Sequence, residues 1–148
     1  MIEYLTNHRE GTIIYQTDGF YISKYSLLYT IEHLCMEYLF TYSGYRKAVK
    51  HVFNFTHLVP IYLDEDLQFI AVKRVRDYDN IFINIKSIDH IEQQKDMLQI
   101  TFTSGRKLYI KMSLYRYNKL IENLSIIRNT KVKHFHWLKY SKCLQLVL

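Results

Sequence analysis

Glycine and proline are both scarce in this chain of 148 residues, which contains four glycines and one proline. Four dispersed glycines cannot build the glycine-rich loop that cradles nucleotide phosphates, and a collagen-like repeat is excluded. Long apolar runs are also missing, because none approaches the roughly 20 residues needed to span a bilayer. These absences predict an ordinary globular domain with no membrane among its partners.

Cysteine is limited to Cys35 and Cys143, which are too few for a disulfide framework. Neither cysteine has neighbours at metal-ligand spacing, so we expect no metal there and no other cofactor. The first residues, Met1-Ile2-Glu3-Tyr4, lack the basic and apolar regions of a secretory signal. Together these features predict a cytoplasmic protein.

Acidic residues are nearly absent from the last third of the chain. Residues 106–148 contain ten lysines and arginines but a single acidic residue, Glu122, whereas residues 1–105 contain ten basic and thirteen acidic residues. A block of one charge sign predicts a polyanionic partner, with nucleic acid as the first choice. An acidic membrane surface or an acidic protein is the alternative, and would make the chain a protein- or phospholipid-binding module with a basic surface.

Short segments of alternating apolar and polar residues, typical of strands, occupy much of the chain. The predicted strands lie over residues 12–15, 20–22, 61–63, 67–75, 81–85, 98–102 and 108–112. Turn residues at Thr17-Asp18-Gly19 and Ser104-Gly105 join two pairs of these strands into hairpins. One face of the second hairpin should pack, and the other should meet solvent or a ligand. Because strands and helices do not alternate regularly, the pattern predicts an α+β fold with a mainly antiparallel sheet.

A short basic helix is predicted in mid-chain, over residues 44–54, with Ser43 as its N-cap. Apolar residues such as Tyr45 and Val49 recur at helical spacing, and basic residues occupy the opposite face. The first turn carries cations, which the positive end of a helix dipole disfavours and which a bound phosphate would stabilise. The basic residues on this helix are Arg46, Lys47, Lys50 and His51.

A second, amphipathic helix is predicted near the C-terminus, from Ser113 to about Arg128. Its expected buried stripe consists of Leu114, Tyr117, Ile121 and Leu124. Residues 26–40 fit either a helix or a strand. We expect a single α+β domain over residues 1–128, followed by a basic, aromatic tail over residues 129–148 that the pattern does not assign.

The tail contains His134 and His136, which would share one face of a strand and could bind a metal. A metal-dependent enzyme is therefore a further alternative, although no third ligand lies nearby in the sequence. The same residues also fit a basic aromatic strip, in which lysines attract phosphates and aromatic rings stack on unpaired bases. A half-buried edge with snorkelling lysines fits equally.

Several short motifs, in this order and spacing, resemble the ComK family of competence transcription factors. The motifs are residues 35–48, Val59-Pro60-Ile61, residues 100–107 and Ser113-Leu114-Tyr115. The similarity runs from about Ile13 to about Leu124. The Gly-Arg pair of the family appears here as Gly44-Tyr45-Arg46, with one residue between.

The resemblance implies a cytoplasmic, non-enzymatic activator of competence genes that binds double-stranded DNA as a homo-oligomer on paired AT-rich promoter boxes. It would read these boxes largely from the minor groove and bend the DNA, with RNA polymerase and a Clp protease adaptor as further partners. We expect Arg46 to enter or border the minor groove and the other cations to neutralise phosphates. The candidate DNA-binding residues are Arg46, Lys47, Lys50, Lys73, Arg74, Arg76, Arg106 and Lys107.

Overall fold

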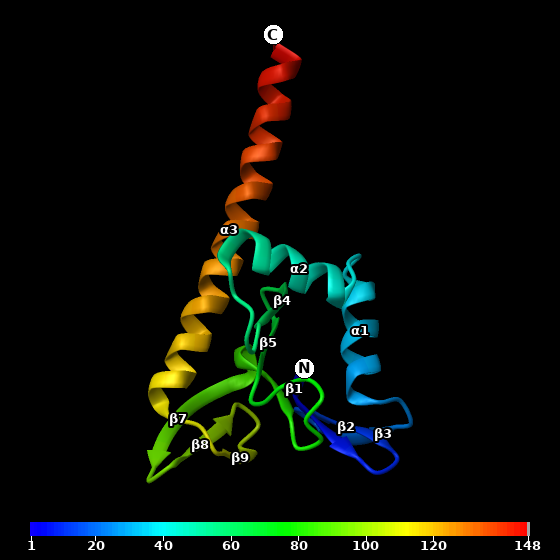
Figure 1. The fold of residues 1–148 in the computed structure, drawn as a ribbon, viewed down its shortest axis with the longest axis vertical. Helices are drawn as coiled ribbons and strands as arrows, with labels where there is room; N and C mark the ends of the chain where they lie inside the picture. The colour runs from blue at the N-terminus through cyan, green and yellow to red at the C-terminus, as the bar shows by residue number, and fades with distance from the viewer. Residues whose placement is uncertain (148) are drawn as a thin grey trace.

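The computed structural model describes the backbone of residues 1–147 and the side chains of residues 1–133. Over these residues it consists of nine strands, three α-helices and one 3₁₀ turn, Ile85–Ser87 (Figure 1). The strands are β1 (Ile2–His8), β2 (Gly11–Gln16), β3 (Gly19–Ser23), β4 (Ile61–Asp64), β5 (Leu67–Ala71), β6 (Ile81–Asn84), β7 (Ile88–Gln94), β8 (Met97–Phe102) and β9 (Lys107–Ile110). The helices are α1 (Leu27–Glu37), α2 (Tyr42–Phe53) and α3 (Leu114–Val147).

The strands form two antiparallel sheets. The larger sheet has six strands in the order β3-β2-β1-β6-β5-β4, and the smaller sheet has three in the order β7-β8-β9. The predicted α+β class is therefore confirmed, together with a short basic helix in mid-chain and a helix at the C-terminus.

One face of the larger sheet packs against the smaller sheet. The register places Tyr4 beside Tyr15 on one neighbouring strand and beside Ile83 on the other, so these side chains share a face. The ring of Tyr4 stacks on Phe102 of β8, with 5.3 Å between the ring centroids. The face that carries Tyr4 is therefore the one that meets the smaller sheet.

The opposite face of the larger sheet packs against helices. Leu5 lies beside Ile14 and Phe82, and it points away from the Tyr4 face because successive strand residues alternate. α1 packs against β1 and β2 and buries Leu27 and Ile31. Figure 1 shows α1 rising from the end of β3 and α2 running from the top of α1 across β4. α1 and the smaller sheet thus lie on opposite faces of the larger sheet.

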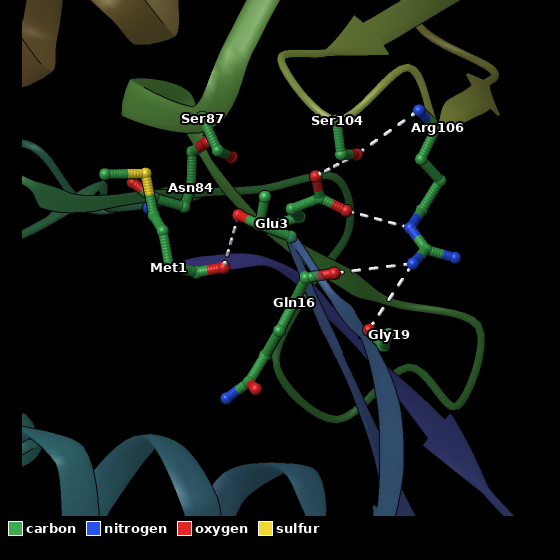
Figure 2. A network of polar contacts seen from close by, with 9 residues as sticks. Met1, Glu3, Gln16, Gly19, Asn84, Ser87, Ser104 and Arg106 are labelled. Carbon is green, nitrogen blue, oxygen red and sulfur yellow. Dashed lines mark hydrogen bonds and ion pairs between the residues drawn. The ribbon is translucent and has the colours of Figure 1, made fainter.

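A buried ion pair joins the two sheets (Figure 2). Glu3 of β1 is fully buried, and Nε of Arg106 donates a hydrogen bond to its Oε1 at 2.8 Å. The hydroxyl of Ser104 donates to the other carboxylate oxygen of Glu3. Nη2 of Arg106 lies within hydrogen-bond distance of the backbone oxygens of Gln16 and Gly19, at 3.3 and 3.4 Å. Arg106 therefore fastens the smaller sheet to the hairpin of β2 and β3.

Four strands differ from the prediction. β1 and β7 are not among the predicted strands, because charged residues such as Glu3 interrupt their apolar pattern. β5 ends at Ala71 instead of Val75. The prediction of one solvent-facing side for the hairpin of β8 and β9 is wrong for β8, where Gln99 and Thr101 are buried together with the apolar residues.

The ambiguous segment before α2 contains a helix, α1, which Ser26 caps by accepting a hydrogen bond from the Tyr29 amide at 3.1 Å. α2 begins earlier than predicted. Its N-cap is Thr41, whose Oγ1 accepts from the Gly44 amide at 3.1 Å, so the prediction of Ser43 as the cap is wrong. Ser43 instead lies in the first turn of the helix.

α3 begins after Ser113, whose hydroxyl accepts a hydrogen bond from the Arg116 amide. It continues to Val147 instead of ending near Arg128, and Figure 1 shows its C-terminal half extending beyond both sheets. Leu114 is exposed, so the buried stripe begins one turn later than predicted. The buried residues of α3 within the described side chains are Tyr117, Leu120, Leu124 and Ile127.

Two basic residues of α3 attach it to the rest of the molecule. Nε of Arg128 donates to both carboxylate oxygens of Glu65, at 2.9 and 3.0 Å. The ammonium group of Lys131 lies 4.7 Å from the ring centroid of Phe40 and 5.4 Å from that of Tyr45. Burial lowers the pKa of Lys131. These interactions connect α3 to the β4–β5 turn and to the junction of α1 and α2.

Candidate nucleic-acid interface

A cleft of about 630 Å³ opens where the first turns of α1 and α2 meet the loop between β5 and β6. Its lining includes the apolar side chains of Leu27, Leu58 and Ala71. It also includes four of the eight candidate DNA-binding residues: Arg46 from α2, and Lys73, Arg74 and Arg76 from the loop. The fold thus brings together cations that are well separated in the sequence.

The β5–β6 loop, residues 72–80, has a backbone that its own side chains organise. Oδ1 of Asn80 accepts a hydrogen bond from the Lys73 amide at 2.8 Å. Oδ2 of Asp77 accepts one from the Arg74 amide at 3.2 Å. Short polar side chains that bond nearby amides are typical of turns, so these two residues shape the basic segment.

The same loop is attached to β1. Nδ2 of Asn7 donates a hydrogen bond to the carbonyl of Tyr78 at 2.6 Å, and both residues line the cleft. Nothing in the local sequence pattern links β1 to this loop, so the sequence gives no signal for the attachment. The loop therefore presents its cations from a backbone held at several points.

The cleft cations differ in whether a carboxylate group lies close enough to pair with them. Lys73 forms an ion pair with Asp79, and the hydrogen bond from Lys73 lowers the pKa of that carboxyl group. Arg74 lies 3.5 Å from Asp77, measured from Nε to Oδ2. Two cleft cations form no ion pair with any side chain described over residues 1–133, namely Arg46 and Arg76. The net field of the cleft is therefore positive.

Tyr45 anchors α2 in the position in which Arg46 lines the cleft. Its hydroxyl donates to the carbonyl of Pro60 at 2.6 Å and accepts from the Tyr62 amide at 3.1 Å. Desolvation by burial raises the pKa of Tyr45. The next residue, Arg46, lies over the ring of Tyr42 with 5.5 Å between its guanidinium carbon and the ring centroid. The residue inserted between Gly44 and Arg46 is therefore a structural anchor.

Lys47 and Lys50 are exposed on the outer side of α2, as the sequence predicts. The first turn of the helix contains no acidic residue, so nothing there compensates its positive end. A Cβ atom at Gly44 would lie 2.7 Å from the capping oxygen of Thr41, so a larger residue there would have to displace the cap. The start of α2 therefore adds amide donors and positive charge beside the cleft.

A family model described as ComK protein matches residues 2–134, nearly the whole chain. The chain belongs to the ComK family. Membership indicates a role as a competence transcription factor, in a family of transcription factors rather than of enzymes. Neither the search of curated proteins nor the search of solved structures found a match.

Two of the candidate cations of this ComK-family chain lie away from the cleft. Arg106 is held by Glu3 and by backbone oxygens at the junction of the two sheets. Its guanidinium carbon also lies 5.0 Å from the ring centroid of Tyr15. Lys107 is exposed on β9 and does not line the cleft. The structure therefore groups Arg46, Lys73, Arg74 and Arg76, keeps Lys47 and Lys50 on the adjacent helix, and separates the last pair.

Arg116 is a further cation beside the cleft that the sequence did not single out. Its Nη2 lies 3.3 Å from Nε2 of His57, which lines the cleft. Because the two residues are far apart in the chain, helical periodicity could only indicate that Arg116 faces outward. The contact places the start of α3 next to the predicted DNA-binding residues of the ComK-family chain.

The side chains of His134 and His136 lie outside the described residues, so the metal alternative is not addressed by their geometry. Over the described part of the chain, no group of three or more His, Cys, Asp or Glu side chains is arranged to hold a metal ion. Within residues 1–147, no helix has both the length and the apolar character required to cross a membrane.

Proposed function

We propose that this ComK-family chain binds AT-rich boxes in the promoters of competence genes and activates their transcription, with the basic cleft and α2 as its DNA-contacting surface. The observation that carries the proposal is the convergence of Arg46 and Arg76 on one cleft from separate elements, without carboxylate partners among the described side chains. Uncompensated arginines on a surface with few nearby acids are what a phosphate backbone or a narrow minor groove attracts.

The cations of the cleft and of α2 would make different contacts with DNA, depending on their position. Arg46 and Arg76, which form no ion pair with the side chains described over residues 1–133, would enter or border the minor groove, where A-tracts concentrate negative potential. Lys47 and Lys50 face outward on α2 and would neutralise phosphates. Lys73 would exchange its exposed ion pair with Asp79 for a phosphate, which costs little because exposed pairs are weak.

Family membership supports three further proposals. The chain would act as a homo-oligomer on paired boxes, recruit RNA polymerase, and be controlled through a Clp protease adaptor. The cleft does not involve Lys107, and Arg106 is engaged in the fold, so we expect both to contribute less to DNA affinity than the cleft arginines.

Fluorescence anisotropy with AT-rich and GC-rich duplexes of equal length tests the proposal. At about 50 and about 200 mM salt, the chain should prefer the AT-rich duplex, and its affinity should fall steeply with salt. Replacing Arg46 and Arg76 together with alanine should weaken binding, and most strongly to the AT-rich duplex, because both arginines are proposed to enter or border the minor groove.

Lys86→Ala is the matched control, because Lys86 is exposed and does not line the cleft. Equal affinities for the double variant, the control and the unchanged chain would contradict the proposed surface. Binding to anionic vesicles without binding to either duplex would favour the phospholipid-binding alternative instead.

A further inference from the structure

Exposed apolar side chains gather on one short segment of the chain. Of the fifteen large apolar side chains that are exposed among the described residues, six belong to residues 20–29: Phe20, Tyr21, Ile22, Tyr25, Leu28 and Tyr29. Isolated exposed apolar residues need no explanation, whereas a contiguous patch marks an interaction site. Three of the six are consecutive residues of β3.

β3 is an edge strand of the larger sheet, and its outer side is open. Over residues 1–147 it pairs only with β2, and Figure 1 shows it at the outer end of the sheet. Within the described part of the chain, Phe20, Tyr21 and Ile22 remain 62%, 50% and 45% exposed. Edge strands are normally protected by lysine, proline or a bulge, and β3 has none of these.

The register of the hairpin determines which backbone groups point outward. Gln16 and Gly19 close a two-residue turn, so Gly19, Tyr21 and Ser23 exchange hydrogen bonds with β2. The amide and carbonyl groups of Phe20 and Ile22 therefore point away from β2. Among the residues that the structure describes, these groups have no hydrogen-bond partner, and they form a row of donors and acceptors along the edge.

We propose that β3 pairs antiparallel with β3 of a second copy of this chain, with the two-fold axis at Tyr21. In that register Phe20 lies opposite the partner's Ile22, and each of the two pairs exchanges two backbone hydrogen bonds. The exposed apolar side chains of both strands then pack against one another. Tyr21 faces the partner's Tyr21 at the centre.

The charges at the ends of β3 select the same register. Asp18 and Lys24 flank the strand, both are exposed, and neither forms an ion pair with another described side chain. Pairing centred on Tyr21 places Gly19 opposite the partner's Ser23, so the turn residue Asp18 comes next to the partner's Lys24, which directly follows β3, at both ends of the interface. A shift of the axis to Phe20 or Ile22 loses both charge pairs, so the segment is self-complementary in one arrangement.

The proposed pairing has a consequence that rests on the proposed function. Two antiparallel strands of one sheet are related by a two-fold axis perpendicular to that sheet, so equivalent faces of both copies point to the same side. α1 packs on one face of the larger sheet, and the basic cleft opens at the first turns of α1 and of α2, which contacts α1. Both clefts of the dimer would therefore face the same side and could bind two neighbouring boxes on one duplex.

Charge reversal tests the interface on the full chain without DNA. Sedimentation equilibrium should show a dimer for the unchanged chain. Asp18→Lys and Lys24→Asp each place like charges opposite one another at both ends, and each should weaken dimerisation about tenfold. The double variant Asp18→Lys/Lys24→Asp restores opposite charges and should recover most of the affinity.

A monomeric unchanged chain at tens-of-micromolar concentration, about the range in which weak dimers form, would overturn the proposal. A dimer insensitive to both single reversals, or a double variant as weak as the singles, would overturn the β3 register. Circular dichroism of each variant checks that the fold is kept, which we expect because both residues are exposed.

DNA binding separates this proposal from the proposed function. If both hold, Asp18→Lys should bind a duplex with one box normally and lose cooperative binding to two boxes. A dimer that binds neither duplex would contradict the DNA surface and leave the β3 pairing standing. Tight but equal binding of all variants to paired boxes would contradict the β3 pairing and leave the DNA surface standing.

Discussion

Arg106 and Arg46 carry the same charge, and the sequence marks both as DNA-binding candidates, yet the fold treats them differently. The guanidinium group of Arg106 is bonded to a buried carboxylate and lies beside two backbone oxygens, whereas that of Arg46 lines an open cleft without an ion pair among the described side chains. A guanidinium whose Nε and Nη2 donors are already used has fewer donors left for a phosphate. The two arginines therefore differ in how many guanidinium donors remain available to a ligand, and not in their charge.

The strongest test of the comparison is Arg106→Ala. It leaves the fully buried Glu3 carboxylate without its partner, which should cost about 3–5 kcal/mol of the free energy of unfolding. Urea unfolding followed by circular dichroism measures this loss. In the double variant Glu3→Gln/Arg106→Ala, the Glu3→Gln substitution removes the unpaired buried charge and should recover part of the lost stability. An Arg106→Ala variant of normal stability with reduced DNA affinity would break the comparison.

A smaller effect is expected at Tyr45, which positions the available arginine. Tyr45→Phe removes the hydroxyl that bonds Pro60 and Tyr62 and leaves buried backbone groups without partners, at a cost of about 1–3 kcal/mol in the free energy of unfolding. Tyr109→Phe, at an exposed hydroxyl, is the control and should change stability very little. Equal stability of the two variants would show that Tyr45 does not anchor α2.

The smallest effect is expected at Arg128. Like Arg106 it forms an ion pair, here with Glu65, but like Arg46 it is exposed to solvent. Hydrogen bonds from Arg128 and Tyr62 lower the pKa of Glu65. A carboxyl group whose pKa is lower in the folded state adds stability above its unfolded pKa, and this stability is lost as the pH falls through the folded pKa. Arg128→Ala should therefore be slightly less stable than the unchanged chain at neutral pH.

Urea midpoints measured at neutral and at acidic pH check this prediction. The difference between Arg128→Ala and the unchanged chain should shrink as Glu65 becomes protonated in acid. Lys133→Ala, an exposed substitution on the same helix, should show no such convergence. A difference that stays constant with pH would mean that the ion pair with Glu65 is not the source of the effect.

The predictable parts of the fold were those set by neighbouring residues. The period of α2 and the turn residues between β2 and β3 are local, and both elements lie close to where the pattern predicts them. β1 was missed because Glu3 looks like a surface residue until its partner, Arg106, is known. The division into a domain over residues 1–128 and a tail stays a prediction.

The candidate site was predictable in part for the same reason. The basic residues of α2 and of the β5–β6 loop stand out as clusters in the sequence, but their meeting in one cleft depends on the order of the strands. The pairing of Arg106 with Glu3 and the contact of Arg116 with His57 are equally long-range. Local sequence patterns therefore identified the basic residues, but could not show which of them lie together in the cleft and which are paired within the fold.

The hydrogen bond from Asn7 to the backbone of Tyr78 reduces the conformational entropy that the β5–β6 loop would lose when a partner binds. A loop that is already ordered before its partner arrives loses less conformational entropy on binding than a free one. Immobilising a long side chain still costs about 0.5–1.5 kcal/mol, but the backbone that carries it adds little further cost. The loop of Arg74 and Arg76 is thus preorganised, and Asn7 of β1 helps to order the surface that is proposed to contact DNA.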